Sequence, residues 1–513
     1  MREARRFIHN TILLTATSLL MRLLAMSFQV YLTRRIGAAG IGLFELLMSV
    51  YGLATALAIS GVRLSTTRLV LEVSVRHRCS RSGIMKLCLR YALCLGLGAG
   101  ALLYALSGPV AALWLDEPQL EPCLRVLAFS LPCLAASSCL NGLFSAQRQA
   151  GRMAVIQVLE FSFHMALTFC ALAVFSPATP ARACLLLVCC SCLSDLFSAA
   201  MAALFYHRER PGRDKTPLFL VGDLLRIAVP DAVGSWVRSG LVSAKHILIP
   251  KGLRRCGASA EGALATYGVI QGMVMPVLGF PSALLGTVSG LLVPEIAESH
   301  ARGQTARLFS IMQRVLHLTL LFSFFSSALL LVYGGELGRL LYKSAEAETY
   351  IRLLSPLVPL MYLDTAVDGM LKGMGLQTAS MRINILDAAI SLMLVWQLIP
   401  RVGIGGYLFT IYVSETLNFL LSFRRLRKQA GLWLPFYRSV LAPVMASMCA
   451  MFLPRLVLPG FCMARPLWAA AASGVLYYLL LRMLGSVTRQ DVRWFLGIFR
   501  ENPVKKAGAT GGC

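Results

Sequence analysis

Apolar runs of about 20 residues, separated by short charged or Gly- and Pro-containing loops, follow one another along most of the chain. The first run extends from Thr11 to about Tyr31, after a basic segment at the N-terminus. Hydrocarbon offers no water to the backbone, so such runs form helices, in which each N–H and C=O is bonded within the segment. The pattern therefore predicts an all-α polytopic membrane protein with about 14 transmembrane helices.

The first run is longer than the core of a signal peptide and lacks a small-residue cleavage site, so we expect it to remain as a membrane helix. Each later run is expected to form one further helix. These runs begin near Ile41, Ile84, Cys123, Met153, Ala183, Leu225, Ala263, Phe309, Tyr350, Met381, Ile404, Phe436 and Pro466.

The order of these segments divides the chain into predicted domains. Two lobes of about six helices each are predicted at 1–203 and 225–430, joined by a cytoplasmic linker at 204–224. Residues 431–486 supply two additional helices, and 487–513 form a cytoplasmic tail. An interfacial helix in this tail would carry one apolar face. That face consists of Val492, Phe495, Leu496 and Phe499.

An internal repeat supports the two-lobe architecture. Arg125 to Leu167 aligns without a gap over Arg352 to Leu394, and polar positions match together with apolar ones. An even helix offset gives both halves the same orientation, with the site expected at their interface. The matched residues include Pro132 with Pro359, Asn141-Gly142 with Asp368-Gly369, and Glu160 with Asp387; a looser match pairs Arg22 with Arg238, Gly42 with Gly268, and Glu45 with Gln271.

The composition agrees with a membrane protein: 57% of the residues are hydrophobic, 14% are charged, and the mean hydropathy is +0.69. The net charge of +25 would suggest nucleic acid binding in a soluble protein. Here Lys and Arg gather in alternate loops, as the positive-inside rule predicts, so we expect no nucleic acid partner. Both termini are then cytoplasmic, and the loop Trp114 to Pro118 lies outside.

The 15 cysteines lie mostly inside apolar runs and are interpreted as small core residues. No pair of cysteines stands with a second pair, or with paired histidines, at the spacing of a zinc site. No nucleophile elbow or phosphate-binding loop occurs either, so we expect neither a cofactor nor enzymatic activity.

Two stretches resemble the multidrug, oligosaccharidyl-lipid and polysaccharide exporter superfamily, and within it the branch of stage V sporulation protein B and lipid flippases. They are Arg22 to Gly40 (RLLAMSFQVYLTRRIGAAG) with the segment that follows, and Leu248 to Glu298 (LIPKGL…PEIAES). The resemblance implies two six-helix lobes around a central cavity, often with two extra helices. It also implies alternating access and movement of lipid-linked glycans.

Arginines in the middle of predicted membrane helices are the first candidate site. Arg22 lies roughly 20 Å into its helix at about 1.5 Å per residue, too deep for easy snorkelling. Arg238 and Lys245 are seven residues apart and share a helix face. A guanidinium fork matches phosphate geometry, so these side chains could hold the pyrophosphate of a polyprenyl-linked glycan. The alternatives are a structural ion pair of Arg22 with Glu45 and outward snorkelling of Lys245.

Other polar residues allow several interpretations. Glu45 and Gln271 could contact substrate, act in a proton or charge relay, or be a packing feature of the repeat. Glu160 with His164, and Asp195, could perform acid–base chemistry or join helices by hydrogen bonds.

A monovalent cation site is implied by the resemblance to sodium-binding flippases, although the spacing departs by one residue from the family pattern. Nearby, Asp364 and Asp368 share a face, and one of them could pair with Lys372. The implied cation ligands are Asp231, Asn384, Asp387 and Thr410.

Three functions follow from these observations. The favoured function is export of a polyprenyl-pyrophosphate-linked glycan across the cytoplasmic membrane, coupled to Na+, H+ or the membrane potential. The alternatives are a cation-coupled multidrug exporter of the same fold and a membrane-embedded transferase. We expect a monomer in the cell membrane, with the glycan lipid and membrane lipids as partners; cavity arginines favour the flippase because a cationic drug would prefer carboxylates.

Overall fold

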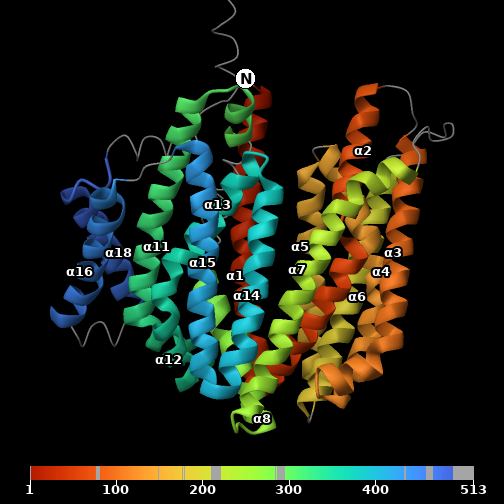
Figure 1. The fold of residues 1–513 in the computed structure, drawn as a ribbon, viewed down its shortest axis with the longest axis horizontal. Coiled ribbons are helices and arrows are strands. Elements are labelled where there is room, and N and C mark those ends of the chain that lie inside the picture. The colour runs from red at the N-terminus through yellow and green to blue at the C-terminus, as the bar shows by residue number, and fades with distance from the viewer. Residues whose placement is uncertain are drawn as a thin grey trace, which may run out of the picture. The chain divides into compact units, whose positions relative to one another are not determined.

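The computed structural model describes residues 2–76, 81–147, 149–175, 177, 179–208, 221–282, 285, 295–431, 435–457 and 466–488. Within these ranges all regular elements are helices, as the apolar pattern predicts. In chain order they are α1 (Arg2–Ile59), α2 (Val62–Arg76), α3 (Arg81–Pro109), η1 (Val110–Trp114), η2 (Pro118–Leu120), α4 (Glu121–Ala146), α5 (Ala150–Phe175), α6 (Pro180–Arg208), α7 (Val221–Arg255), α8 (Ala260–Gly268), η3 (Val269–Val274), α9 (Met275–Gly279), α11 (Thr305–Tyr342), α12 (Ala345–Leu354), η4 (Ser355–Leu357), α13 (Val358–Gly373), α14 (Gln377–Val402), α15 (Ile404–Ala430), η5 (Tyr437–Leu441), α16 (Ala442–Val457) and α18 (Pro466–Met483) (Figure 1).

Nine helical stretches of the described residues are long and apolar enough to cross a membrane. The longest, Leu20–Leu71, has 52 residues, whereas one crossing needs about 20, so the number of stretches is not the number of crossings. The all-α polytopic class is therefore confirmed, and the count of about 14 helices stays a prediction.

A break at Gly37 divides α1, which is 58 residues long. Gly37 has φ 75° and ψ 173°, a conformation that a residue with a Cβ rarely adopts. Residues Ala38 to Ile59 therefore form a second helix, separated from the first by a kink at Gly37.

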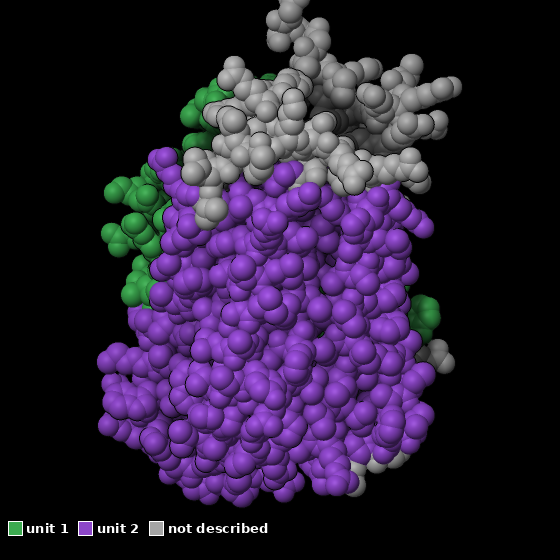
Figure 2. All heavy atoms as spheres, turned by 90° about the vertical axis from the view of Figure 1, so that its right-hand side faces the viewer, with its two compact units in different colours: residues 1–31, 269–387, 408–513 green, residues 32–268, 388–407 purple. Residues whose placement is uncertain are grey.

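The chain packs as two compact units, coloured separately in Figure 2. Unit 1 contains Met1–Tyr31, Val269–Asp387 and Leu408–Cys513; unit 2 contains Leu32–Gly268 and Ala388–Tyr407. The first part of α1 thus packs with the later helices, and α7 packs with the earlier ones. This division reflects packing, so the domain boundaries inferred from the repeat stay a prediction.

The two prolines that the repeat alignment matches, Pro132 and Pro359, occupy different places in their helices. Pro132 lies inside α4, which continues as one helix from Glu121 to Ala146. Pro359 is the second residue of α13, directly after the short 3-10 segment η4. The helix that carries Pro132 thus runs through this proline, whereas the helix that carries Pro359 begins one residue before it. The predicted tail helix at Val492 to Phe499 lies outside the described residues.

The core of unit 1 is built around α11. Met312 and Leu316 of α11 pack with Leu371 of α13 and Leu426 of α15, and all four are fully buried or nearly so. The two additional helices predicted after the second lobe correspond to α16 and α18, which both contact α11. The Tyr477 hydroxyl of α18 donates to the Leu321 carbonyl of α11 at 2.7 Å.

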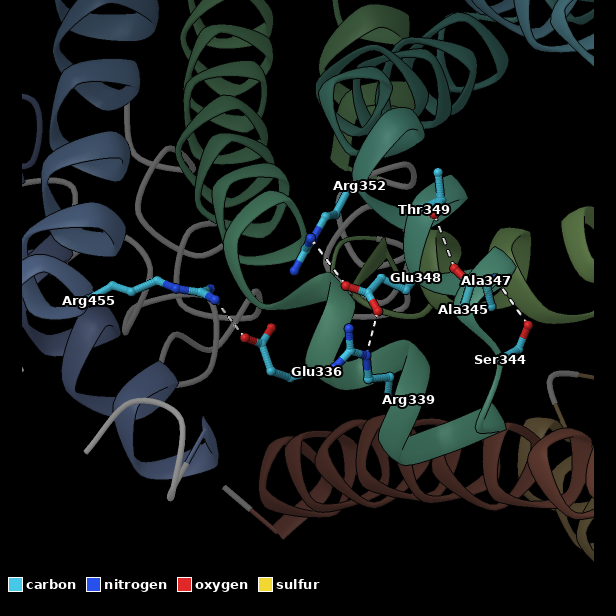
Figure 3. A network of polar contacts seen from close by, with 9 residues as sticks. All are labelled: Glu336, Arg339, Ser344, Ala345, Ala347, Glu348, Thr349, Arg352 and Arg455. Atoms are coloured by element: carbon cyan, nitrogen blue, oxygen red, sulfur yellow. Dashed lines mark hydrogen bonds and ion pairs between the residues drawn. The ribbon is translucent and has the colours of Figure 1, made fainter. Parts of the chain in front are cut away.

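A polar network at one end of α11 fixes α12 and α16 (Figure 3). Glu336 of α11 pairs with Arg455 of α16 at 2.8 Å. Glu348 of α12 accepts from Arg339 at 2.6 Å and from Arg352 at 3.2 Å. Each carboxylate thus meets a guanidinium, which makes these charges tolerable at the end of a membrane helix.

Unit 2 contains a very close helix contact between Gly42 of α1 and Gly268 of α8. A Cβ added to Gly42 would overlap the Leu264 carbonyl oxygen, and one added to Gly268 would overlap the Ala38 carbonyl and lie 2.9 Å from the Gly42 Cα. Only glycine permits this approach of two backbones. Gly42 and Gly268 are also the pair that the repeat alignment matches, so equivalent residues of the two halves touch.

Replacement of either glycine by alanine tests this contact. Gly42→Ala and Gly268→Ala are each expected to lower the free energy of unfolding by about 1–3 kcal/mol, because backbone atoms must move to admit the methyl group. Gly98 of α3 is the matched control, since a Cβ there meets nothing within 4 Å. Thermal unfolding of detergent-solubilised variants measures the effect, and equal melting temperatures for all three would contradict the contact.

Candidate functional site

Glu45 lies one helical turn after Gly42, and the close contact places it near Tyr267 of α8. The two groups are within electrostatic range of each other. Tyr267 is only 1% exposed, and its hydroxyl is 3.0 Å from Nδ1 of His246 on α7. Lys245, the residue before His246, interacts electrostatically with that imidazole. The hydrogen-bonded pair of Tyr267 and His246 thus lies beside two predicted site residues, Glu45 and Lys245.

The sequence analysis did not single out Tyr267 or His246. Both stand in largely apolar stretches, ATYGV and AKHIL, where a tyrosine or histidine resembles an ordinary core residue. The sequence offered one indication of their role. Tyr267 and His246 each bring a hydrogen-bonding group into a membrane helix, and such a group requires a partner.

Arg238 of α7 is exposed. On the same helix, the Trp236 indole donates to the Ala56 carbonyl at 3.1 Å, and the Ser239 hydroxyl donates to the Gly52 carbonyl, also at 3.1 Å. Both acceptors are backbone atoms of α1, whose positions are set by the helix itself. The two bonds therefore fix which face of α7 is turned toward α1. The guanidinium of Arg238 remains outside this contact and forms no ion pair with another described residue.

Arg22 belongs to unit 1 and is likewise exposed. Seven residues further along the same face of α1, Gln29 donates to the Gly272 carbonyl of η3 at 3.2 Å. The half-buried Gln271 lies beside Gly272 in this π-helical segment, a geometry often found at functional sites. Arg22 forms no ion pair with a described residue of unit 1, and the alternative pair with Glu45, which belongs to unit 2, stays a prediction.

The predicted cation ligands separate into two groups. Asp231 belongs to unit 2, whereas Asn384, Asp387 and Thr410 belong to unit 1. Asp387 accepts from the Ser414 hydroxyl at 2.7 Å, and Thr410 is buried. In the described residues no group of three or more His, Cys, Asp or Glu side chains could hold a metal ion.

A neighbouring polar cluster in unit 1 joins three helices. The side-chain amide of Asn418 on α15 donates to Oδ2 of Asp364 on α13 at 3.2 Å and to the side-chain oxygen Oδ1 of Asn384 on α14 at 3.4 Å. On the same side of α13, Asp368 pairs with Lys372 at 2.6 Å, as the sequence suggested for one of the two aspartates. Asn418 was missed because a single amide in an apolar helix gives no spacing pattern.

Comparison with known proteins places the chain in a family. The model of the polysaccharide biosynthesis protein family matches residues 7–239, and the MatE model matches residues 256–396. Stage V sporulation protein B of Bacillus subtilis is 25% identical over 430 residues, which cover 81% of this chain and 82% of that protein. The chain belongs to the multidrug, oligosaccharidyl-lipid and polysaccharide exporter superfamily.

Other similar proteins agree with this assignment. Sporulation protein YkvU of Bacillus subtilis is 21% identical over 405 residues, covering 77% of this chain and 88% of that one. An inward-closed structure of the lipid II flippase MurJ has a TM-score of 0.72 at 11% identity and covers 94% of this chain and all of that one (100%). An inward-facing multidrug resistance MATE family transporter has a TM-score of 0.62 at 13% identity, with coverages of 80% and 94%.

The superfamily assignment confirms the expected fold and the general class of function. The chain is a multi-pass membrane transporter of the exporter superfamily, with the helical fold that the MurJ and MATE structures share. Whether Arg22 and Arg238 share one cavity involves both units and stays a prediction.

The hydroxyl of Tyr267 provides a test of the site in unit 2. Tyr267→Phe keeps the ring and removes the bond to His246, so we expect a loss of about 1–3 kcal/mol in unfolding free energy from a buried group left unpaired. Tyr104→Phe is the control, because Tyr104 is 48% exposed. Chemical or thermal unfolding in detergent measures both; an unchanged Tyr267→Phe variant would show that the bond is not formed.

Proposed function

We propose that this transporter moves a polyprenyl-pyrophosphate-linked glycan across the cytoplasmic membrane. The proposal rests on the exposure of Arg22 and Arg238 and on the lack of an ion pair between either of them and a described residue. Both lie in long membrane helices, both are exposed, and neither forms an ion pair with a described residue. Charged side chains are costly in hydrocarbon and mark transport pathways when they persist. An anionic head group is the natural partner of two arginines.

The relatives support the same substrate class. One family model is that of polysaccharide biosynthesis proteins, and one structural neighbour is a lipid II flippase. Two curated relatives are sporulation proteins. We therefore assign the glycan to a cell-wall or spore-cortex precursor or a polysaccharide unit.

The chemistry of the pathway distinguishes this substrate from a drug. An amphipathic cation would be repelled by Arg22, Arg238 and Lys245, whereas a pyrophosphate accepts the bidentate hydrogen bonds of a guanidinium. The glycan itself adds hydroxyl groups, for which Gln271 and Glu45 are suitable partners. A membrane-embedded transferase would need a set of catalytic side chains. The polar side chains proposed for this site are suited to binding a substrate instead.

For coupling, we propose a monovalent cation at the oxygen-rich part of unit 1. Asn384, Asp387 and Thr410 are the predicted ligands there, and the hydrogen-bonded Asp364 and Asn418 extend the set. Carboxylate and amide oxygens suit a hard cation. Asp231 stays a predicted fourth ligand from α7.

Substitution of the two arginines tests the substrate. Arg22→Gln and Arg238→Gln, alone or together, are expected to leave insertion and folding intact and to abolish glycan-lipid translocation, because the anionic head loses its charged partner. Arg22→Lys should restore activity only in part, since lysine lacks the planar fork. The measurement is translocation of a labelled polyprenyl-pyrophosphate sugar in reconstituted vesicles.

The control for this experiment is Arg401→Gln, an exposed arginine at the end of α14. It should translocate like the unmodified protein. Full activity of the double Gln variant would overturn the assignment, and export of a cationic dye by that variant would favour the multidrug alternative.

The orientation is also part of the proposal, with both termini in the cytoplasm. In a variant depleted of cysteines, Asp116→Cys should react with a membrane-impermeant maleimide added to intact cells, because Asp116 is well exposed in the predicted outer loop. Lys428→Cys, at the opposite predicted face, should react only after the membrane is opened. The reverse pattern would contradict the topology.

A further inference from the structure

The last turns of α15 in unit 1 carry four basic residues within five positions: Arg424, Arg425, Arg427 and Lys428. All four side chains are exposed, and none of them has a hydrogen bond or ion pair with another described residue. The proposed substrate site does not use them. We refer to these four residues as the basic end of α15.

A buried leucine fixes the direction in which the basic end points. Leu426 lies among the four basic residues and is fully buried. It packs in the same apolar core as Leu308 of α11 and Leu371 of α13. This part of α15 is therefore held against the rest of unit 1, and its basic side chains are turned away from that core.

Carboxylates near these helix ends have other partners. Glu295 pairs with Arg307, in the first turn of α11, at 2.9 Å. Asp368 pairs with Lys372, in the last turn of α13, at 2.6 Å. In the described part of unit 1 the basic end thus keeps its positive charge, so a counter-charge has to come from outside the chain.

An exposed apolar stripe leads along α15 to the basic end. Phe409 and Leu420 are 56% and 55% exposed. They are 11 residues apart, about three turns, and so lie on one face of the helix. Arg424 follows Leu420 by one turn, and Arg427 continues the same face. Exposed apolar side chains of a membrane helix suit lipid tails, so the arginines lie where the tails give way to headgroups.

The neighbouring helix α14 shows the same change from apolar to basic. Arg382 is exposed, and Leu386, one turn further into the helix, is 48% exposed. Between them, Asn384 accepts from Asn418 of α15 at 3.4 Å, so the two helices lie side by side (Figure 1). Because α14 and α15 are consecutive helices joined by a turn at Gly403, they run in opposite directions. Arg382 and the basic end therefore lie at the same end of the helix pair.

The chemistry of this surface fits a phosphate group attached to lipid tails. Each guanidinium offers a planar fork of donors that matches two phosphate oxygens. Basic side chains close to a membrane helix are attracted to the negative surface of the cytoplasmic leaflet. The apolar stripe adds contacts that a soluble phosphate lacks.

We infer that the basic end of α15, together with Arg382, binds the phosphate groups of anionic phospholipids. The bound lipids hold this end of unit 1 at the headgroup layer. Binding itself does not rest on the proposed glycan substrate. Its place in the cytoplasmic leaflet follows from the proposed orientation, with both termini in the cytoplasm.

Native mass spectrometry of the purified full-length protein in detergent tests this inference by titration with phosphatidylglycerol. Each single change to Gln among Arg424, Arg425 and Arg427 should weaken lipid binding about fivefold, because one charge near the headgroup is lost. The variant in which all four basic residues are changed to Gln should lose binding by about a hundredfold or more. Phosphatidylcholine with the same acyl chains should bind this variant and the unmodified protein equally.

Two control variants separate lipid binding from a general effect of the substitutions. A variant with Arg424→Lys, Arg425→Lys and Arg427→Lys keeps the charge and should keep most of the binding. Lys343→Gln changes an exposed cation at the other end of α11 and should bind phosphatidylglycerol like the unmodified protein. The single Gln variants decide the question if the quadruple variant does not fold.

Several results would overturn the inference. Unchanged phosphatidylglycerol binding by the Gln variants would show that the basic end is merely hydrated, and an equal loss in Lys343→Gln would show an effect of net charge alone. Displacement of the lipid by an equal concentration of glycerol 3-phosphate, which has no tails, would indicate a site for a soluble phosphate instead.

The outcome is independent of the substrate test, because the titration contains no glycan lipid. Inactive or fully active variants of Arg22 and Arg238 leave its result unchanged. A protein that translocates glycan lipid but binds phosphatidylglycerol equally well with and without the basic end overturns the lipid site alone.

Discussion

The contact of Gly42 with Gly268 is the constraint on which the candidate site in unit 2 depends. Membrane helices gain little from burying apolar surface against each other, so close backbone packing is a main source of their association. At this point α1 and α8 approach until no Cβ fits between them. Glu45 follows one turn after the first glycine, and Tyr267 directly precedes the second. The position of both polar groups is therefore a consequence of the glycine contact.

In both units, arginines near helix ends differ from Arg22 and Arg238 in how their charge is satisfied. Arg254 of α7 pairs with Asp116 at 3.0 Å and with Glu117, and Arg455 pairs with Glu336. These pairs lie near helix ends, where water and a counter-charge are both available. Arg22 and Arg238 lie within their helices, exposed and unpaired in the described chain. A charged side chain within a membrane helix needs water or a counter-charge, and the proposed anionic substrate would supply that counter-charge to both arginines.

The apolar pattern was sufficient to predict the fold class, because hydrocarbon permits helices and closed barrels only and the runs had helix length. The repeat alignment also matched Gly42 with Gly268 as equivalent positions. It could not predict that they touch, since contact depends on how helices cross. The same reason explains why Tyr267, His246 and Asn418 were missed: each is a single polar group whose meaning comes from a partner distant in sequence.

The predicted repeat pairs residues of different chemistry at matched positions of the two halves. If the predicted duplication holds, its two-fold axis passes near the contact of Gly42 and Gly268, because residues related by such an axis touch only at or near it. Glu45 and Gln271 each lie three residues beyond their glycine. Glu45 has a carboxyl group and Gln271 an amide of the same size, so the two side chains have the same shape but differ in charge. In a duplicated scaffold this difference in charge would give one half an ionisable side chain at a position where the other half has a neutral one.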